Sequence, residues 1–206
     1  MMYFKIVFMI TFKKQNQDPP YLKFKKEYDR ALYADQKIIE AISVSSFCKS
    51  NSIVDSRYVN LKIVDDMDFI FFSNYDSPKS KQFMSHNQVC VTIFWNTTNV
   101  QIRMRANIKK TPKEFNDKYF SSRSPKKNAL AISSNQSNKI DSYQSVEKRF
   151  KEAERTEDLN KCPKYWGGYV FRPYYFEFWK GHDSRLNKRK VYELQNQKWV
   201  KYFLQP

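Results

Sequence analysis

Alternation of apolar and polar residues in the middle of the chain predicts antiparallel strands. Residues 88–95 and 100–109 both show this period of two, and the polar Asn-Thr-Thr-Asn segment between them predicts a hairpin. In the second segment Gln101, Arg103 and Arg105 fall on one face. That face is typical of a solvent-exposed surface and is also compatible with the wall of a binding site.

The same period, with aromatic and β-branched residues, predicts further strands at residues 37–48, 56–64, 68–73, 169–179, 189–194 and 198–204. Helical spacing or helix-start signals predict helices at residues 22–36, from Pro78, at 111–122 after a Thr-Pro-Lys-Glu capping box, and at 142–158. Roughly seven strands and three or four helices, without regular βαβ alternation, favour a mainly β protein of the α+β class. An antiparallel sheet curled into a barrel with flanking helices fits best.

The N-terminal run Met1–Phe12 is apolar except for Lys5 and is too short to span a bilayer. It has no Ala-x-Ala-like cleavage site, so we expect a peripheral strand or the start of a helix; initiation at Met9 is an equal alternative. We expect residues 1–206 to form a single domain, with residues 1–20 as a peripheral N-terminal segment.

Charge and cysteine content narrow the class of protein. The 206 residues carry a formal net charge of +16, but the lysines are spread over every segment. A basic solvated surface is the simpler interpretation, and the positive charge would also favour binding of small phosphorylated ligands. Cys48, Cys90 and Cys162 show no C-x-x-C spacing, and only His86 and His182 could join them. We therefore expect no metal site, a cytoplasmic location, and neither nucleic acid nor a membrane as partner.

Glycine occurs only three times, and all three residues lie between Pro163 and Arg189: Gly167, Gly168 and Gly181. Because glycine permits positive φ or a close approach of the backbone to a bulky group, we expect special geometry in this segment.

Arg185, Asn187 and Arg189 follow the last glycine at intervals of two. In an extended segment they would share one face, so two guanidinium groups and an amide would point the same way. Such a set suits an anionic or polar planar ligand.

Two further patterns suit anion binding. Ser77 precedes Pro78 and Lys79 as an N-cap precedes a first helical turn. A helix that starts here would offer a phosphate its free backbone N–H groups, the Ser77 hydroxyl and the Lys79 ammonium. A simple helix cap is the more common explanation of this pattern. Tyr119 and Arg123 lie one helical turn apart and can converge on an anion.

Arg57 and Lys62 lie on the predicted strand 56–64. Because they are five residues apart, a regular strand would place them on opposite faces. Only a bulge, a twist or a ligand lying across the strand end would let both serve one site.

Taken in order, these segments resemble the FMN-dependent pyridoxine/pyridoxamine 5′-phosphate oxidases over about residues 18–206. The matching blocks are Ser56–Lys62, Phe71–Lys79, Val100–Gln101, Lys118–Arg123, Asn135–Ser137, Tyr165–Tyr169, and Phe176–Gly181 with Arg185–Arg189. Any one block is common. All of them in order, ending in Glu-Phe-Trp and Arg-Leu-x-x-Arg with a terminal proline, are highly specific.

The resemblance implies a split β-barrel homodimer with two FMN sites across the subunit interface and a small phosphorylated substrate. The implied FMN contacts are Arg57, Lys62, Lys79, Gln136 and Ser137, with the Ser77 hydroxyl nearby, and, around the isoalloxazine ring, Phe72, Ser73, Gln101, Trp179 and Arg189. The implied substrate contacts are Lys62, Tyr119 and Arg123 at the phosphate, and Arg185 and Asn187 at the pyridine ring. Arg185 is expected to be the main substrate-orienting residue, with Asn187 as a weaker partner.

Four positions depart from the family pattern. Asn187 stands where the family typically has histidine, and its amide cannot titrate near neutral pH. Pro78 replaces a basic residue and Phe72 a tyrosine, while Lys127 replaces a serine in the substrate-phosphate loop and would add a charge. The N-terminus also lacks the Arg-x-x-Tyr arm that covers the substrate in relatives.

These expectations favour an FMN-dependent oxidase that converts pyridoxamine or pyridoxine 5′-phosphate to pyridoxal 5′-phosphate, with O₂ as electron acceptor. One alternative, motivated by Asn187, Pro78 and Lys127, is an FMN-dependent oxidoreductase of the same fold that acts on a different substrate in a specialised pathway. The other is a non-enzymatic protein that binds flavin or nucleic acid.

Overall fold

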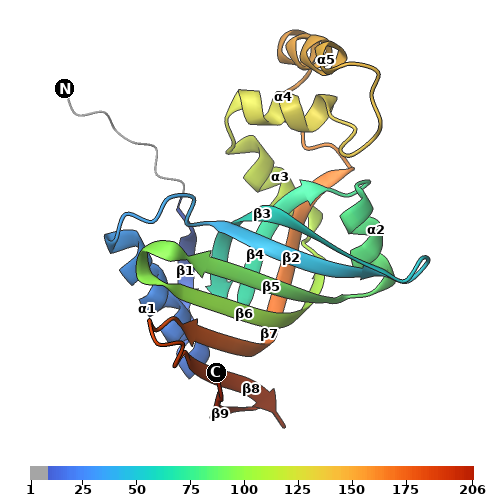
Figure 1. The fold of residues 1–206 in the computed structure, drawn as a ribbon. Helices are drawn as coiled ribbons and strands as arrows, with labels where there is room; N and C mark the ends of the chain where they lie inside the picture. Colours follow the sequence, from blue (N-terminus) through green and yellow to red (C-terminus); the bar gives the residue numbers. More distant parts are fainter. Residues whose placement is uncertain (1–8) are drawn as a thin grey trace, which may run out of the picture.

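The computed structural model describes residues 9–206, which form a nine-stranded sheet and five α-helices (Figure 1). The strands are β1 (Thr11–Gln15), β2 (Ala41–Cys48), β3 (Ile53–Asp66), β4 (Asp68–Asn74), β5 (Gln88–Trp95), β6 (Val100–Lys110), β7 (Trp166–Lys180), β8 (Lys188–Gln195) and β9 (Lys198–Leu204). The helices are α1 (Pro19–Tyr33), α2 (Pro78–Ser85), α3 (Lys113–Ser121), α4 (Pro125–Ser133) and α5 (Tyr143–Thr156). None of these helices is long and apolar enough to cross a membrane.

Six strands close into a barrel in the order β3-β2-β5-β6-β7-β4, and β4 pairs with β3 to complete the ring. All of these pairs are antiparallel, whereas β1 adds to β3 in parallel. The expected mainly β architecture, an antiparallel barrel with helices outside it, is confirmed.

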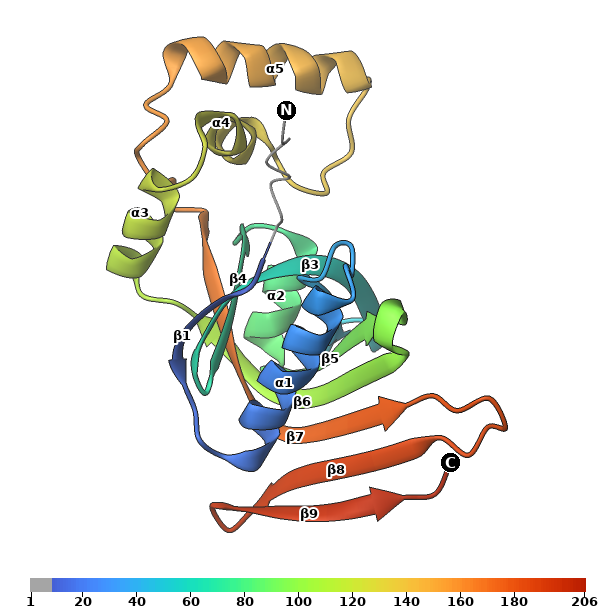
Figure 2. The same ribbon diagram turned by 90° about the vertical axis from the view of Figure 1, so that its left-hand side faces the viewer.

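β7 connects the two ends of the molecule. Its first part, Trp166 to Phe171, pairs with β4, and its last part, Tyr175 to Lys180, pairs with β8. The β8–β9 hairpin therefore continues the sheet beyond the barrel. It lies at the end opposite to α3, α4 and α5 (Figure 2).

Aromatic side chains of α1 pack onto the barrel core. Tyr21, Phe24 and Tyr28 are buried, although most other residues of the helix are polar. The ring of Phe24 lies edge-on to Phe69, with 5.0 Å between the centroids, and 5.9 Å from Trp95. This narrow aromatic stripe explains why a helix forms here, because a polar helix is stabilised mainly by packing of one apolar face.

Close side-chain contacts explain the glycines, none of which has a positive φ. A Cβ on Gly167 would overlap with the Tyr75 hydroxyl and the Asn116 amide, and a Cβ on Gly181 would overlap with the Asn99 side chain. The special geometry expected in this segment is confirmed, and it consists of close approach rather than left-handed backbone.

The structure contains elements that the sequence patterns did not predict. In α4 only Asn128 and Ala129 are buried, so no apolar stripe marks this helix. β1 begins at Thr11, and residues 1–8 of the predicted N-terminal element lie outside the described residues.

The predicted capping box at the start of α3 is wrong. The N-cap residue is Pro112, which has no side-chain donor or acceptor. The Thr111 hydroxyl instead donates to Asn116 Oδ1 at 2.5 Å. Asn116 Oδ1 also accepts from the backbone N–H of Gly168, so this network ties α3 to β7.

Candidate functional site

A cavity of about 790 Å³ opens between the barrel and the α3–α4 region. Ten of the residues singled out in the sequence line it: Arg57, Lys62, Phe72, Ser73, Lys79, Tyr119, Arg123, Lys127, Gln136 and Ser137. The remaining wall residues are Tyr58, Val59, Asn60, Ser122, Ser124 and Trp166. Five of these described wall residues are basic and none is acidic, so the cavity favours anionic ligands.

Arg57 and Lys62 line the same cavity, and β3 has a β-bulge at Lys62. Leu61 pairs with Phe71 and Ile63 with Ile70, so Lys62 is an extra residue on β3 opposite β4. The bulge breaks the strict alternation of faces that would otherwise separate the two cations. Of the three explanations left open by the sequence, the structure contains the bulge.

Lys79 and Arg57 form the first cation cluster. Lys79 is only 8% exposed, and its ammonium donates to Ser77 Oγ at 3.1 Å and Gln136 Oε1 at 2.8 Å. Burial, and then the charge of Arg57, lower the pKa of Lys79 to about 8. A buried ammonium that donates to a hydroxyl and an amide oxygen is a good site for an anion.

The Arg57 guanidinium is held in place by its own acceptors. It donates to Asp55 Oδ2 at 2.5 Å, Gln82 Oε1 at 2.9 Å and Ser46 Oγ at 2.6 Å. Gln82 lies on α2, so these bonds tie the start of β3 to the helix that carries Lys79. The two cations are therefore positioned by one network.

Ser77 lies beneath this cluster and is fully buried. It is the N-cap residue of α2, as predicted, but its hydroxyl donates to Asn74 O at 2.7 Å and does not cap the helix. Ser77 does not line the cavity. Its contact with the site is the hydrogen bond from Lys79.

Lys62, Arg123 and Lys127 form the second cation cluster, with Tyr119 beside them. Burial lowers the pKa of Arg123, and Nη1 of this buried guanidinium has no hydrogen-bond partner among residues 9–206. Burial also lowers the pKa of Lys62, with smaller contributions from Lys127 and Arg123. The grouping of like charges indicates that this end of the cavity also suits an anion.

Parallel aromatic rings lie beside the second cluster. Phe72 stacks on Tyr119 with 3.6 Å between centroids and on Trp166 with 5.2 Å. The Arg123 guanidinium lies 4.4 Å from the Trp166 ring centroid. Stacking and the cation–π contact therefore fix the positions of Tyr119 and Arg123.

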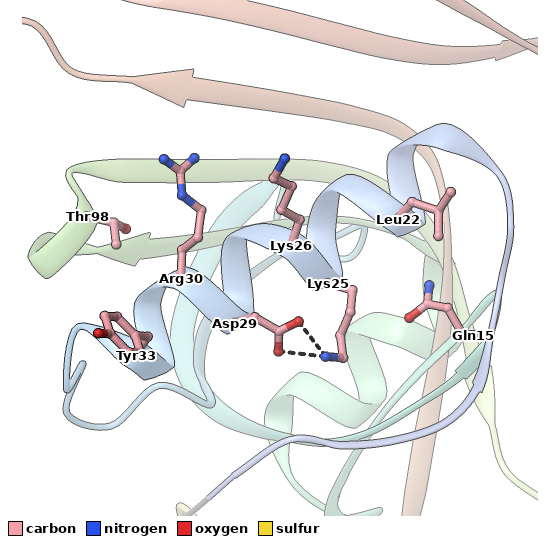
Figure 3. A pocket seen from close by; sticks show the side chains of 8 residues that line it. All are labelled: Gln15, Leu22, Lys25, Lys26, Asp29, Arg30, Tyr33 and Thr98. Atoms are coloured by element: carbon pink, nitrogen blue, oxygen red, sulfur yellow. Dashed lines mark hydrogen bonds and ion pairs between the residues drawn. The ribbon is translucent and has the colours of Figure 1, made fainter.

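A different depression, of about 710 Å³, follows the outer face of α1 (Figure 3). Lys25 and Asp29 form an ion pair of 2.6 Å there, while the Arg30 side chain extends away from the helix. None of the candidate site residues contributes to its wall.

Comparisons with known proteins agree with this geometry. Residues 42–157, more than half of the chain, match the family described as "Pyridoxamine 5'-phosphate oxidase". Residues 166–206 match the "Pyridoxine 5'-phosphate oxidase C-terminal dimerisation region". The chain belongs to the pyridoxamine 5′-phosphate oxidase family.

Two relatives show the extent of the similarity. Pyridoxine/pyridoxamine 5′-phosphate oxidase 1 of Hydrogenovibrio crunogenus is 38% identical over 86% of this chain and 82% of the relative. The corresponding oxidase of Herminiimonas arsenicoxydans is 33% identical over 91% of this chain and 89% of the relative.

Solved structures confirm the split-barrel fold of this oxidase family. PhzG from Burkholderia lata, crystallised with tetrahydrophenazine-1-carboxylic acid, has a TM-score of 0.86 at 24% identity and covers 92% of this chain and 95% of its own. A pyridoxamine 5′-phosphate oxidase-related, FMN-binding protein from Nostoc punctiforme has a TM-score of 0.71 at 13% identity. The match covers 91% of this chain and 96% of the Nostoc protein. At these identities the likeness concerns the fold alone.

The remaining candidate residues of this family member lie away from the cavity. Gln101, Trp179 and Arg189 are directly opposite one another on β6, β7 and β8 and form a row across the sheet. Arg189 Nε donates to Glu177 Oε1 at 2.7 Å, and Arg103 Nη2 donates to Glu177 Oε2 at 2.5 Å. We call these five residues the β6–β8 row. None of them lines the cavity.

The loop that precedes β8 carries Arg185 and Asn187. Arg185 is exposed and has a φ of 65°, and its N–H donates to His182 O at 2.9 Å. Asn187 Oδ1 accepts from the backbone N–H of His182 at 3.1 Å. The segment is a compact turn, so the prediction that Arg185, Asn187 and Arg189 share one extended face is wrong. Neither Arg185 nor Asn187 lines the cavity.

Trp166 lines the cavity and Glu177 binds two arginines of the β6–β8 row, but neither residue was assigned a role from the sequence. Both lie in blocks of the family resemblance, and Trp166 immediately precedes the glycine pair, where the backbone approaches other side chains closely. The role of Glu177 depends on cross-strand neighbours, which no local pattern signals.

Proposed function

We propose that the protein is an FMN-dependent oxidase that converts pyridoxamine or pyridoxine 5′-phosphate to pyridoxal 5′-phosphate. Family membership supports the reaction class. The two cation clusters of one cavity carry the proposal, because cofactor and substrate each bring a phosphate. The amine would be converted with O₂ and water to the aldehyde, ammonia and hydrogen peroxide. The alcohol would require only O₂ and would also give hydrogen peroxide.

The first cation cluster fits the phosphate of FMN. Lys79 is buried beside a hydroxyl and an amide oxygen, so a dianionic phosphate would supply its counter-charge. Arg57 would donate to the same phosphate, and Ser137 and Gln136 lie on the same wall. Bound FMN would supply the hydride-accepting chemistry, while the protein binds and orients it.

The second cation cluster is proposed to bind the substrate phosphate. Lys62, Arg123 and Lys127 supply charge, and Tyr119 supplies a hydroxyl. Because the aromatic stack holds Tyr119 and Arg123, the phosphate would be bound at a fixed point and the substrate ring oriented from it.

We further propose that the active form is a homodimer in which the β6–β8 row, Arg185 and Asn187 of one copy complete the cavity of the other. Two observations support this assembly: residues 166–206 match a dimerisation region, and these side chains lie outside the cavity of their own chain. Arg185 and Asn187 would then orient the pyridine ring, and Trp179 and Arg189 the isoalloxazine.

A different substrate is the second candidate. Asn187 cannot supply an imidazolium, Pro78 removes one cation, and Lys127 adds one in the second cluster. An anionic substrate with a carboxylate in place of the phosphate would also satisfy that cluster. The fold neighbour PhzG was solved with a phenazine carboxylic acid, which shows that the fold admits such ligands in that protein.

Spectra and turnover distinguish the candidates. We expect the purified protein to be yellow, with flavin absorption, and to release hydrogen peroxide with pyridoxamine phosphate. A flavin-loaded protein that turns over neither pyridoxamine nor pyridoxine phosphate would favour the different substrate. A colourless protein that cannot be loaded with FMN but binds DNA or RNA in a salt-sensitive way would contradict the enzyme proposal altogether.

A further inference from the structure

Glu40 is a buried carboxylate that lies behind the cavity wall and has no part in the function proposed above. It is 2% exposed, and its Oε1 lies 3.5 Å from the Lys62 ammonium. Its Oε2 has no hydrogen-bond partner within the described part of the chain. A buried carboxylate needs a counter-ion, and Lys62 is the cation that the structure brings to it.

The backbone around Glu40 is anchored. Leu61 N–H donates to Glu40 O at 2.8 Å, and Trp95 Nε1 donates to Ile39 O at 3.0 Å. The backbone that carries this buried carboxylate is thus fixed beside the bulge that carries Lys62.

Charged groups surround Lys62 on two sides. Glu40 faces it from the start of β2, while Arg123 and Lys127 face it from the α3–α4 region, with the Tyr119 hydroxyl on the same cavity wall. Attraction to the fixed carboxylate opposes repulsion from the two cations. The ammonium has three donors, so it can keep Glu40 and still donate to a ligand in the cavity.

We propose that Glu40 is a positioning residue that anchors the Lys62 ammonium at the bulge and keeps it charged for the substrate phosphate. The identity of that phosphate rests on the proposed function. The anchoring of Lys62 does not, because it follows from the burial of Glu40 and the bulge of β3.

Glu40 raises the pKa of Lys62, whereas burial, Lys127 and Arg123 lower it. Removing the carboxylate would therefore let Lys62 lose its proton at lower pH. Because the phosphate binds the protonated lysine, alkaline loss of substrate binding would also begin at lower pH. The substrate KM would change and kcat would not, since Glu40 does not line the cavity.

The direct test measures Lys62 in protein without substrate. Competitive acetylation of amines at a series of pH values, followed by peptide mass spectrometry, gives its titration. In Glu40→Gln we expect the Lys62 curve to move by about one pH unit to lower pH, a tenfold change in protonation equilibrium. The Lys79 curve is an internal control and should not move.

Glu27→Gln is the matched variant. Glu27 is 5% exposed and lies 2.8 Å from the Lys23 ammonium on α1, so the substitution also breaks a buried ion pair. It lies outside the cavity wall. Titration of Lys62 should be the same in Glu27→Gln as in the parent protein, which separates anchoring from a general loss of stability.

The second measurement is the pH dependence of KM for pyridoxamine phosphate with the FMN-loaded protein. Glu40→Gln should match the parent in acid, and its KM should begin to rise about one pH unit below the pH at which the KM of the parent rises. Adding Lys62→Arg should abolish this earlier rise, because a guanidinium stays charged.

Each outcome decides one proposal. Identical Lys62 titration in Glu40→Gln and the parent would overturn the anchoring role. A shifted titration without turnover of either pyridoxamine or pyridoxine phosphate in both proteins would support anchoring and contradict the proposed substrate. If Glu40→Gln does not fold, Glu40→Asp withdraws the same charge by one methylene. That variant should shift the titration in the same direction by a smaller amount, and an unchanged titration would again overturn the role.

Discussion

The cavity and the β6–β8 row both concentrate cations, but they compensate the charges differently. In the row a single carboxylate, Glu177, which is 3% exposed, binds both Arg103 and Arg189. In the cavity Lys79 and Arg123 form no ion pair with a carboxylate of residues 9–206. Both arginines of the row are thus paired with a carboxylate of their own chain, whereas Lys79 and Arg123 make the cavity suited to receive anions.

The difference indicates a division of tasks. A guanidinium paired with a carboxylate contributes shape and directed hydrogen bonds, while a buried ammonium with neutral partners contributes attraction for phosphate. We therefore expect substitutions of the cavity cations to change ligand affinity, and loss of the Glu177 carboxylate in the row to change stability. Substitutions in the loop at Arg185 are expected to change turnover.

The largest expected effect tests whether the two regions meet across a dimer. Arg185→Ala should lower kcat/KM for pyridoxamine phosphate about 100-fold, because the residue would orient the substrate ring. FMN affinity should stay unchanged. A 1:1 mixture of Arg185→Ala and Lys79→Gln subunits, unfolded and refolded together, should recover about a quarter of parental activity, since half of the dimers would have one intact site. Absence of recovery in mixed dimers would contradict a shared site.

Lys79→Gln alone should weaken FMN binding roughly 30- to 100-fold, by about 2–3 kcal/mol, because a charge-assisted hydrogen bond to phosphate is lost. Quenching of FMN fluorescence on titration gives the Kd. Lys81→Gln, on the same helix but exposed, is the control and should bind as the parent does. Equal losses in both variants would indicate a general effect of surface charge.

Glu177→Gln should lower the free energy of unfolding by about 2 kcal/mol, because Arg103 and Arg189 lose their shared carboxylate. Burial raises the pKa of Glu177, but the hydrogen bond from Arg189 and the charge of Arg103 outweigh it, so the pKa of Glu177 in the folded protein is lowered. The ionised Glu177 therefore stabilises the folded protein at pH values above its pKa in the unfolded chain. This stabilisation is lost as the pH falls through its pKa in the folded protein. Urea unfolding should show a difference between parent and variant at pH 7 that disappears in acid. A difference in the free energy of unfolding that stays constant with pH would contradict a stabilising role of the ionised Glu177.

FMN affinity should fall as pH rises through about 8, where Lys79 loses its proton in the free protein. The decline should approach tenfold per pH unit, because the phosphate binds the protonated lysine. Titrations between pH 7 and 9 measure it. Lys79→Arg should remove the decline, and riboflavin, which has no phosphate, should show none in the parent.

The smallest effect compares the two ends of the glycine segment. Gly167→Ala should destabilise the protein by about 1 kcal/mol more than Gly181→Ala, measured by thermal unfolding. At Gly167 the new methyl group meets Tyr75 and the buried Asn116, which are hydrogen-bonded to each other. At Gly181 it meets Asn99, an exposed side chain that can move. Equal losses would show that the packing around Gly167 relaxes.

The sequence predicts the elements whose signals are local. The β5–β6 hairpin appears at the expected position, because alternation along each strand matches one buried face. β9 also appears at the expected position, although none of its residues is buried. α4 was missed for the converse reason: it buries little. Its Ser124–Pro125 start resembles that of α2 and was the signal available.

Features that depend on pairing between distant strands could not be predicted. The bulge at Lys62 exists only because β4 pairs with β3, so the sequence left the joint use of Arg57 and Lys62 open. The turn at Arg185 is a left-handed backbone conformation of a non-glycine residue, which no sequence period signals. Residues that share a cavity wall are thus predicted better by family resemblance than by spacing.

The length of β7 fixes the distance between the cavity and the β6–β8 row of one chain. Trp166, at the cavity, and Trp179, in the β6–β8 row, lie thirteen residues apart on one strand, or roughly 40 Å at about 3.3 Å per residue. No side-chain rotation spans that distance within one chain. Catalysis should therefore vanish on dilution below the dissociation constant of the dimer, while each separated subunit keeps its cationic cavity.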